Sequence, residues 1–115
     1  MRLRRFKITD ISKKDWKLFR EKLSGWQENY MEGLVKTYVD FLNGDKKSAS
    51  EKIWELQKRI TEDKHHPGVI MELKKSEVIW DIVRLIRLKV ITYNDLSDFS
   101  DELQNEVKRI LEMSR

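Results

Sequence analysis

The sequence predicts an all-α protein, and three observations support this fold class. Apolar residues recur at steps of three and four along most of the chain, which is the spacing of one face of a helix. Only one proline and four glycines occur in 115 residues. Charged residues make up 38% of the chain, well above the share of about a quarter in average domains. We therefore expect a single-domain helical bundle over residues 13–115, with four main helices and one short helix.

The first predicted helix is long. From Lys13 onward, one apolar and aromatic stripe contains Trp16, Phe19, Leu23, Trp26, Tyr30, Leu34, Tyr38 and Leu42. Ser12, with Asp15 three residues later, indicates an N-cap and a capping box, and the glycine within residues 43–45 indicates the end. A helix of about 30 residues is about 45 Å long, which exceeds the width of a compact domain of this size. Either Gly25 bends this helix, or one end of it projects toward a partner.

Two further helices are expected in the middle of the chain. The segment "SASE" supplies a cap for a second helix, whose inner edge is expected to contain Ile53, Leu56 and Ile60. A third helix is expected over residues 67–89, because a proline in the first turn has no N–H to satisfy. Its second half, "VIWDIVRLIRLKVI", is apolar on most sides, which predicts a central place in the bundle.

The C-terminal part predicts a short helix capped by Thr92 and a last helix that is opened by Ser97 or Ser100. Together with the third helix, these elements follow the outline of a helix-turn-helix. Residues 94–106, however, contain five acidic side chains and no lysine or arginine, so their surface would be repelled by DNA. We therefore expect these helices only to pack against one another.

The net charge is concentrated at the N-terminus. The chain contains 24 Lys and Arg against 20 Asp and Glu, and the excess equals the four basic side chains Arg2, Arg4, Arg5 and Lys7. Residues 1–12 are expected to form a basic arm. Weak, sequence-nonspecific nucleic-acid binding by this arm is the alternative function, although a body without net charge gives it little support. A basic tail without any partner is the other interpretation.

The sequence offers few groups for catalysis or metal binding. The absence of cysteine excludes disulfides, thiolate zinc sites and cysteine nucleophiles. No Ser–His–Asp pattern, HExxH, P-loop or GxGxxG occurs. On a helix the rings of His65 and His66 would diverge by about 100°, and Glu62 with His66 alone supplies too few ligands for a metal. We therefore predict no enzymatic activity, no cofactor and no metal.

The aromatic stripe of the first helix is the main candidate site. Aromatic residues at helical spacing, with leucines between them, are more typical of a core or a subunit interface than of a surface that stacks on bases. If the helix is straight, homodimerisation would hide its projecting part. The predicted function is a non-enzymatic interaction or regulatory module that self-associates through this helix. The candidate interface residues are Trp16, Phe19, Leu23, Trp26, Tyr30 and Tyr38.

Three segments, "GWQENYMEGL", "KHHPGVIMELKKS" and "ITYNDLSDFSDEL", resemble a group of small bacterial all-helical proteins of unknown function. The resemblance extends over residues 25–111 and leaves the basic arm outside. It implies a cytoplasmic bacterial protein and no site residue. A cytoplasmic location also agrees with the lack of an apolar run of about 20 residues, the length that a membrane span requires.

Overall fold

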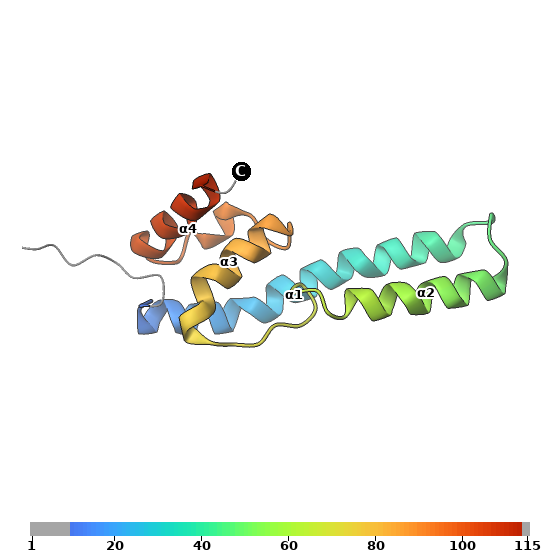
Figure 1. Ribbon diagram of the computed structural model, residues 1–115, viewed down its shortest axis with the longest axis horizontal. Helices are drawn as coiled ribbons and strands as arrows, with labels where there is room; N and C mark the ends of the chain where they lie inside the picture. Colours follow the sequence, from blue (N-terminus) through green and yellow to red (C-terminus); the bar gives the residue numbers. More distant parts are fainter. Residues whose placement is uncertain (1–9, 114–115) are drawn as a thin grey trace, which may run out of the picture. The chain divides into compact units, whose positions relative to one another are not determined.

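The computed structural model describes residues 10–113, and this part of the chain is helical without strands. Four α-helices are present: α1 (Lys13–Asn43), α2 (Ala49–Asp63), α3 (Val78–Arg87) and α4 (Asp101–Met113) (Figure 1). Two short 3-10 helices, η1 (Lys75–Glu77) and η2 (Tyr93–Leu96), lie before and after α3. The predicted all-α class with a long first helix is confirmed.

Residues 1–9 of the basic arm lie outside the described part of the chain. Arg2, Arg4, Arg5 and Lys7 lie beyond the described residues, so nucleic-acid contact by the arm stays a prediction. The description begins at Asp10.

The described chain forms two compact units. The core unit contains residues 10–24 and 72–113, and the hairpin unit contains residues 25–71. Helix α1 contributes its first part to the core unit and its second part to the hairpin unit, and it is helical without interruption through Gly25. The single-domain prediction for residues 13–115 stays a prediction.

The core unit is built on α3. Its buried apolar side chains come from the start of α1, from α3, from η2 and its flanks, and from α4. They are Ile11, Phe19, Leu23, Val78, Ile79, Ile82, Val83, Leu85, Ile91, Leu96, Phe99, Leu103, Val107 and Ile110. Five of these side chains belong to the ten residues of α3, which confirms that the apolar segment is central. Burial of this set supplies the main hydrophobic stabilisation of the unit.

The predicted starts of the first, short and last helices are confirmed. The hydroxyl of Ser12 accepts a hydrogen bond from the N–H of Asp15 at 3.0 Å. Thr92 and Asp95 form a reciprocal capping box at the start of η2. The hydroxyl of Ser100 accepts from the N–H of Leu103 at 3.3 Å, so Ser100 opens α4. Each cap satisfies N–H groups that have no partner within the first turn.

The carboxylate of Asp15 has a different role from the predicted capping box. It accepts hydrogen bonds from the N–H of Ser100 at 2.9 Å and from the Ser100 hydroxyl at 2.5 Å. The side chain is 3% exposed. A single buried carboxylate therefore joins the start of α1 to the start of α4.

The predicted third helix over residues 67–89 is wrong at its start. Helix α3 begins only at Val78, after the 3-10 helix η1. The carbonyl of His66 accepts from the N–H groups of Val69 and Ile70, at 2.8 and 3.0 Å, which closes a tight turn around Pro67. Glycine and β-branched residues follow this proline, and these residues have low helix propensity. Proline therefore marks a turn here and not the first turn of a helix.

Candidate interaction surface on the helical hairpin

The hairpin unit consists of the second part of α1 and the antiparallel helix α2, which are joined by residues 44–48 (Figure 1). Helix α2 begins with a complete capping box between Ser48 and Glu51. At the same end, the ammonium group of Lys52 donates to the carbonyl of Leu42 at 2.9 Å, which satisfies an acceptor in the last turn of α1. Local sequence signals thus explain why the chain reverses direction at this point.

Polar and aromatic contacts hold the two helices together. The hydroxyl of Tyr38 donates a hydrogen bond to the carboxylate of Asp63. The Tyr30 ring stacks on the His66 ring, with centroids 4.5 Å apart and an interplanar angle of 7°. The pKa of Tyr38 is raised to about 12, first by desolvation and then by its hydrogen bond to Asp63. These contacts align the helices, but they form no apolar core.

The hairpin unit contains few buried residues. Helix α2 contains no buried residue, and the buried residues of the described unit are Trp26, Pro67 and Gly68. A pair of helices stays stable in water mainly by burying an apolar stripe, because helix propensity alone is weak. We infer that this hairpin lacks the apolar cover that two helices of this length normally require.

One side of the hairpin is apolar and exposed. We call this surface the hairpin face and define it by five aliphatic side chains: Val35, Val39 and Leu42 of α1, with Ile53 and Ile60 of α2. Their exposed fractions range from 39% to 63%. The three α1 residues follow steps of four and three, and the two α2 residues are seven apart, so each set lies on one side of its helix.

A groove shows that the two sets lie on the same side of the hairpin. It has a volume of about 190 Å³ and is lined by both helices and the segment after α2. Its lining residues are Met31, Leu34, Val35, Tyr38, Ile60, Asp63, Lys64 and Val69. Because Val35 and Ile60 line the same groove, the apolar sets of α1 and α2 form one surface.

A cluster of charged side chains lies on a different side of α2 from Ile53 and Ile60. Arg59 and Glu55 form an ion pair at 3.1 Å, and Lys47 lies 3.8 Å from the same carboxylate. The hydrogen bond from Arg59 lowers the pKa of Glu55. The Arg59 guanidinium also lies 4.3 Å from the centroid of the Phe41 ring. Glu55 and Ile53 are two positions apart, which separates them by about 200° around the helix. The hairpin is thus polar on one side and apolar on the other.

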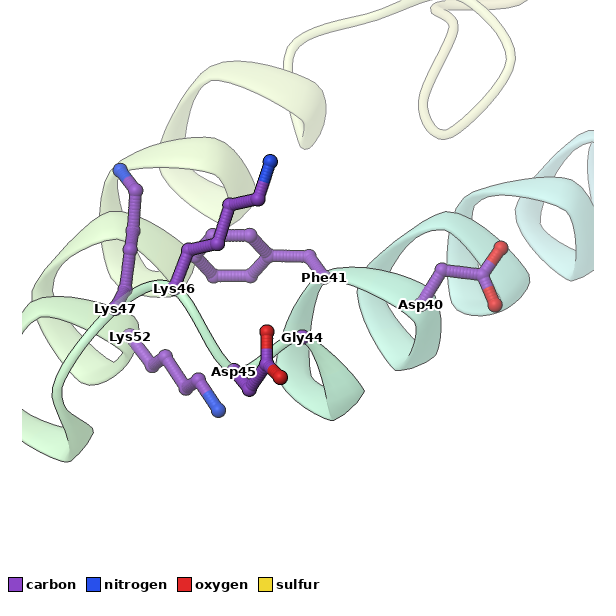
Figure 2. A pocket seen from close by; sticks show the side chains of 7 residues that line it. All are labelled: Asp40, Phe41, Gly44, Asp45, Lys46, Lys47 and Lys52. Carbon is purple, nitrogen blue, oxygen red and sulfur yellow. The ribbon is translucent and has the colours of Figure 1, made fainter.

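A second hollow, of about 300 Å³, lies at the tip of the hairpin (Figure 2). Its lining residues are Asp40, Phe41, Gly44, Asp45, Lys46, Lys47 and Lys52. Lys52 donates to a backbone carbonyl and Lys47 is near Glu55. Figure 2 shows that the lysine side chains diverge, with Asp45 beside them. Because the lining mixes both signs of charge and its cations do not converge, we assign no ligand to it.

The structure distributes the predicted interface residues between two surroundings. Phe19 and Leu23 are buried in the core unit, and Trp26 is buried in the hairpin unit. Trp16, Tyr30 and Tyr38 are partly buried. Tyr30 and Tyr38 contact the segment after α2 and the end of α2, respectively. The self-association of this stripe stays untested, but its side chains are less accessible than the hairpin face.

Sequence reasoning placed two hairpin-face residues incorrectly. Ile53 and Ile60 were expected on the inner edge of the second helix, whereas they are 63% and 44% exposed. Contacts to α1 come instead from Lys52, Arg59 and Asp63 of α2 and from His66 after its end. The sequence signal for the exposed face was the pair Val35 and Val39, which each follow a member of the aromatic stripe by one residue and lie four residues apart.

Among residues 10–113, no group of three or more His, Asp or Glu side chains could hold a metal ion. His66 is occupied by Tyr30 on its face and by the N–H of Gly68, which donates to its Nδ1 atom at 2.9 Å. In the same part of the chain, none of the helices is long and apolar enough to cross a membrane.

Among the carboxyl groups of the described residues, Asp81 has the pKa with the largest upward shift. Burial, and then the nearby Glu77 carboxylate, raise its pKa from 3.8 to about 6, while Arg84 acts in the opposite direction. Its Oδ2 atom is buried without a hydrogen-bond partner. A partly buried carboxylate with an unpartnered oxygen, beside a second carboxylate, is unfavourable in its charged form, so Asp81 lowers the stability of the fold at neutral pH.

Replacing Asp81 by asparagine is expected to stabilise the protein at neutral pH by about 1–2 kcal/mol, after allowance for partial solvent screening. Between about pH 4 and pH 6 the folded chain holds a proton on Asp81 that the unfolded chain releases, so stability falls as the pH rises through this window. The extra stability of Asp81→Asn over the wild type should therefore vanish near pH 4. Urea unfolding across this range tests it, with the exposed Asp10→Asn as control. A less stable Asp81→Asn at neutral pH would contradict the explanation.

No protein-family model matches this chain, and no curated protein or solved structure matches it significantly. The resemblance to small bacterial helical proteins accordingly stays a prediction, as does a cytoplasmic location.

Proposed function

We propose that the protein is a non-enzymatic interaction module that self-associates through the hairpin face. The observation that carries this proposal is that α2 contains no buried residue although it presents exposed isoleucines on one side. A second copy would supply the missing apolar cover. The proposal retains the predicted self-association through the first helix but moves the contact to the hairpin part of that helix.

The size of the hairpin face is sufficient for a weak dimer. Helix α2 has 15 residues, about 22 Å, and two adjacent helices are about 20 Å wide, which gives roughly 450 Å² on each copy. Stable specific interfaces bury at least about 600 Å² on each partner, so a face of this size is in the range of weak, transient dimers. The five aliphatic side chains are about half exposed, so burying them in both copies contributes about 10 kcal/mol of favourable hydrophobic free energy. Association costs of at least about 4 kcal/mol offset much of this, so we expect a weak dimer with a dissociation constant no lower than about 40 μM.

The test compares two lysine substitutions on α1. Val35→Lys places a charge within the hairpin face, whereas Thr37→Lys places the same charge about 200° away around the helix. Both original side chains are β-branched, similar in size and exposed. We expect Val35→Lys to raise the dimer dissociation constant at least tenfold and Thr37→Lys to leave it within about twofold. Light scattering after size-exclusion chromatography gives the mass of each variant.

Circular dichroism on the same samples establishes that each variant is folded. Equal masses for the two variants, with unchanged helix content, would remove the hairpin face as the site of self-association. Thr37 donates a hydrogen bond to the carbonyl of Gly33 at 3.1 Å on the exposed surface, and its loss is not expected to alter the helix.

A further inference from the structure

The two ends of the hairpin face have different shapes. The groove occupies the end that is formed by Met31–Tyr38 of α1 and by the last part of α2. Val39, Leu42 and Ile53 lie outside the groove lining, nearer the tip, and are exposed. One end is therefore a hollow, and the other end carries three projecting aliphatic side chains.

The stripe that contains the α1 part of this face also changes charge along its length. At alternating steps of four and three it contains Glu28, Glu32, Val35, Val39 and Leu42. Two exposed carboxylates thus precede the apolar centre. Beyond the helix end, Lys46 and Lys47 occupy the turn (Figure 2). The stripe is acidic at the groove end, and Lys46 follows it in the turn, whereas Lys47 lies toward Glu55 on the other side of the hairpin.

Two copies can place their hairpin faces together in two symmetric ways. A two-fold axis parallel to the helices puts tip against tip, so that hollow faces hollow and the lysines of both turns lie near each other. A two-fold axis across the helices puts the tip of each copy against the groove of the other. Only the second arrangement fills the groove with apolar side chains and brings Lys46 of each copy near the acidic end of the other. Interfaces favour both close packing and opposite charges.

We propose that a second copy docks antiparallel on the hairpin face, with Leu42 and Ile53 of each copy against the groove of the other, to complete a four-helix bundle. This inference rests on the proposed self-association and specifies its orientation. The pairing of opposite charges also explains why the carboxylates lie in the same stripe as the valines. Val35 of each copy then lies near Val39 of the other, close to the two-fold axis.

Zero-length carbodiimide coupling of the unmodified protein tests the orientation. It joins carboxylates to ammonium groups that are in contact. Glu32 and Lys46 are 14 positions apart along the chain, about 21 Å if the helix is extended to that point, so they cannot be coupled within one chain. We expect cross-linked peptides that join Glu28 or Glu32 to Lys46. A mixture of isotopically light and heavy protein should show that these links join two copies.

A tip cysteine provides the complementary test. The chain contains no cysteine, so Asp45→Cys introduces a single thiol in the turn. In the antiparallel arrangement the two thiols are too far apart to form a disulfide, which requires a Cα separation below about 7 Å. A dimer with cross-links from Glu28 or Glu32 to the turn, and without a disulfide in Asp45→Cys, supports the proposal. A dimer with an Asp45→Cys disulfide, or with neither link, overturns the orientation but not the self-association. A monomeric wild-type mass overturns both.

Discussion

Replacing Asp15 by alanine is expected to lower the free energy of unfolding by about 3 kcal/mol. The carboxylate is 3% exposed and accepts two hydrogen bonds from Ser100, one from the N–H and one from the hydroxyl. Its removal leaves two partly buried donors of Ser100 at the start of α4 without this acceptor, which costs more than the loss of an exposed contact. The effect should be seen in urea unfolding monitored by circular dichroism.

Two further variants define the origin of this effect. The exposed Asp10→Ala, five residues earlier, should change stability by less than about 0.5 kcal/mol. Ser100→Ala should also lower the free energy of unfolding. The double variant, Asp15→Ala with Ser100→Ala, should lose less than the sum of the two single losses, because both changes remove the same hydrogen bond. An Asp15→Ala protein as stable as wild type, or strictly additive losses, would show that this contact does not join α1 to α4 in solution.

Replacing Gly68 by alanine is expected to destabilise the hairpin unit by about 2 kcal/mol. A Cβ atom at this position would lie 2.4 Å from a carbon of the Tyr30 ring, well inside van der Waals contact. The ring is stacked on His66, so it cannot move aside without losing that contact. Thermal unfolding with far-UV circular dichroism gives the loss of helix stability.

The Tyr30→Ala background tests whether the Tyr30 ring is the cause. Tyr30→Ala has its own cost, because it removes the stacking on His66. In this background Gly68→Ala should lower the free energy of unfolding by less than about 0.5 kcal/mol, since no ring remains to clash with the added Cβ atom. A full cost in both backgrounds would point instead to the backbone conformation of Gly68.

Local sequence signals predicted the helix ends well, because a cap depends on residues only a few positions apart. Ser12, Thr92 and Ser100 were each predicted and each accept or organise hydrogen bonds at a helix start. Pro67 was misleading because the same residue also suits a tight turn, and the hydrogen bonds to the His66 carbonyl favour that turn. The all-α class followed from periodicity, which does not depend on such local choices.

Contacts between distant parts of the chain could not be predicted. The partner of Asp15 is Ser100, 85 positions away, and no pattern in the sequence pairs them. The position of Ile53 and Ile60 depends on which stripe of α2 faces α1, and the contacts of Tyr38 with Asp63 and Tyr30 with His66 decide this. Periodicity identifies an apolar stripe, but it does not say whether the same chain or another one covers it.

Sedimentation equilibrium of the wild-type chain over a wide concentration range tests the central claim most directly. The exposed hairpin face predicts a reversible dimer, with a mass that rises toward twice 13.9 kDa above roughly 100 μM and falls toward the monomer mass on dilution. A mass of 13.9 kDa at every concentration, with α2 fully helical, would contradict the claim that a second copy covers the hairpin face.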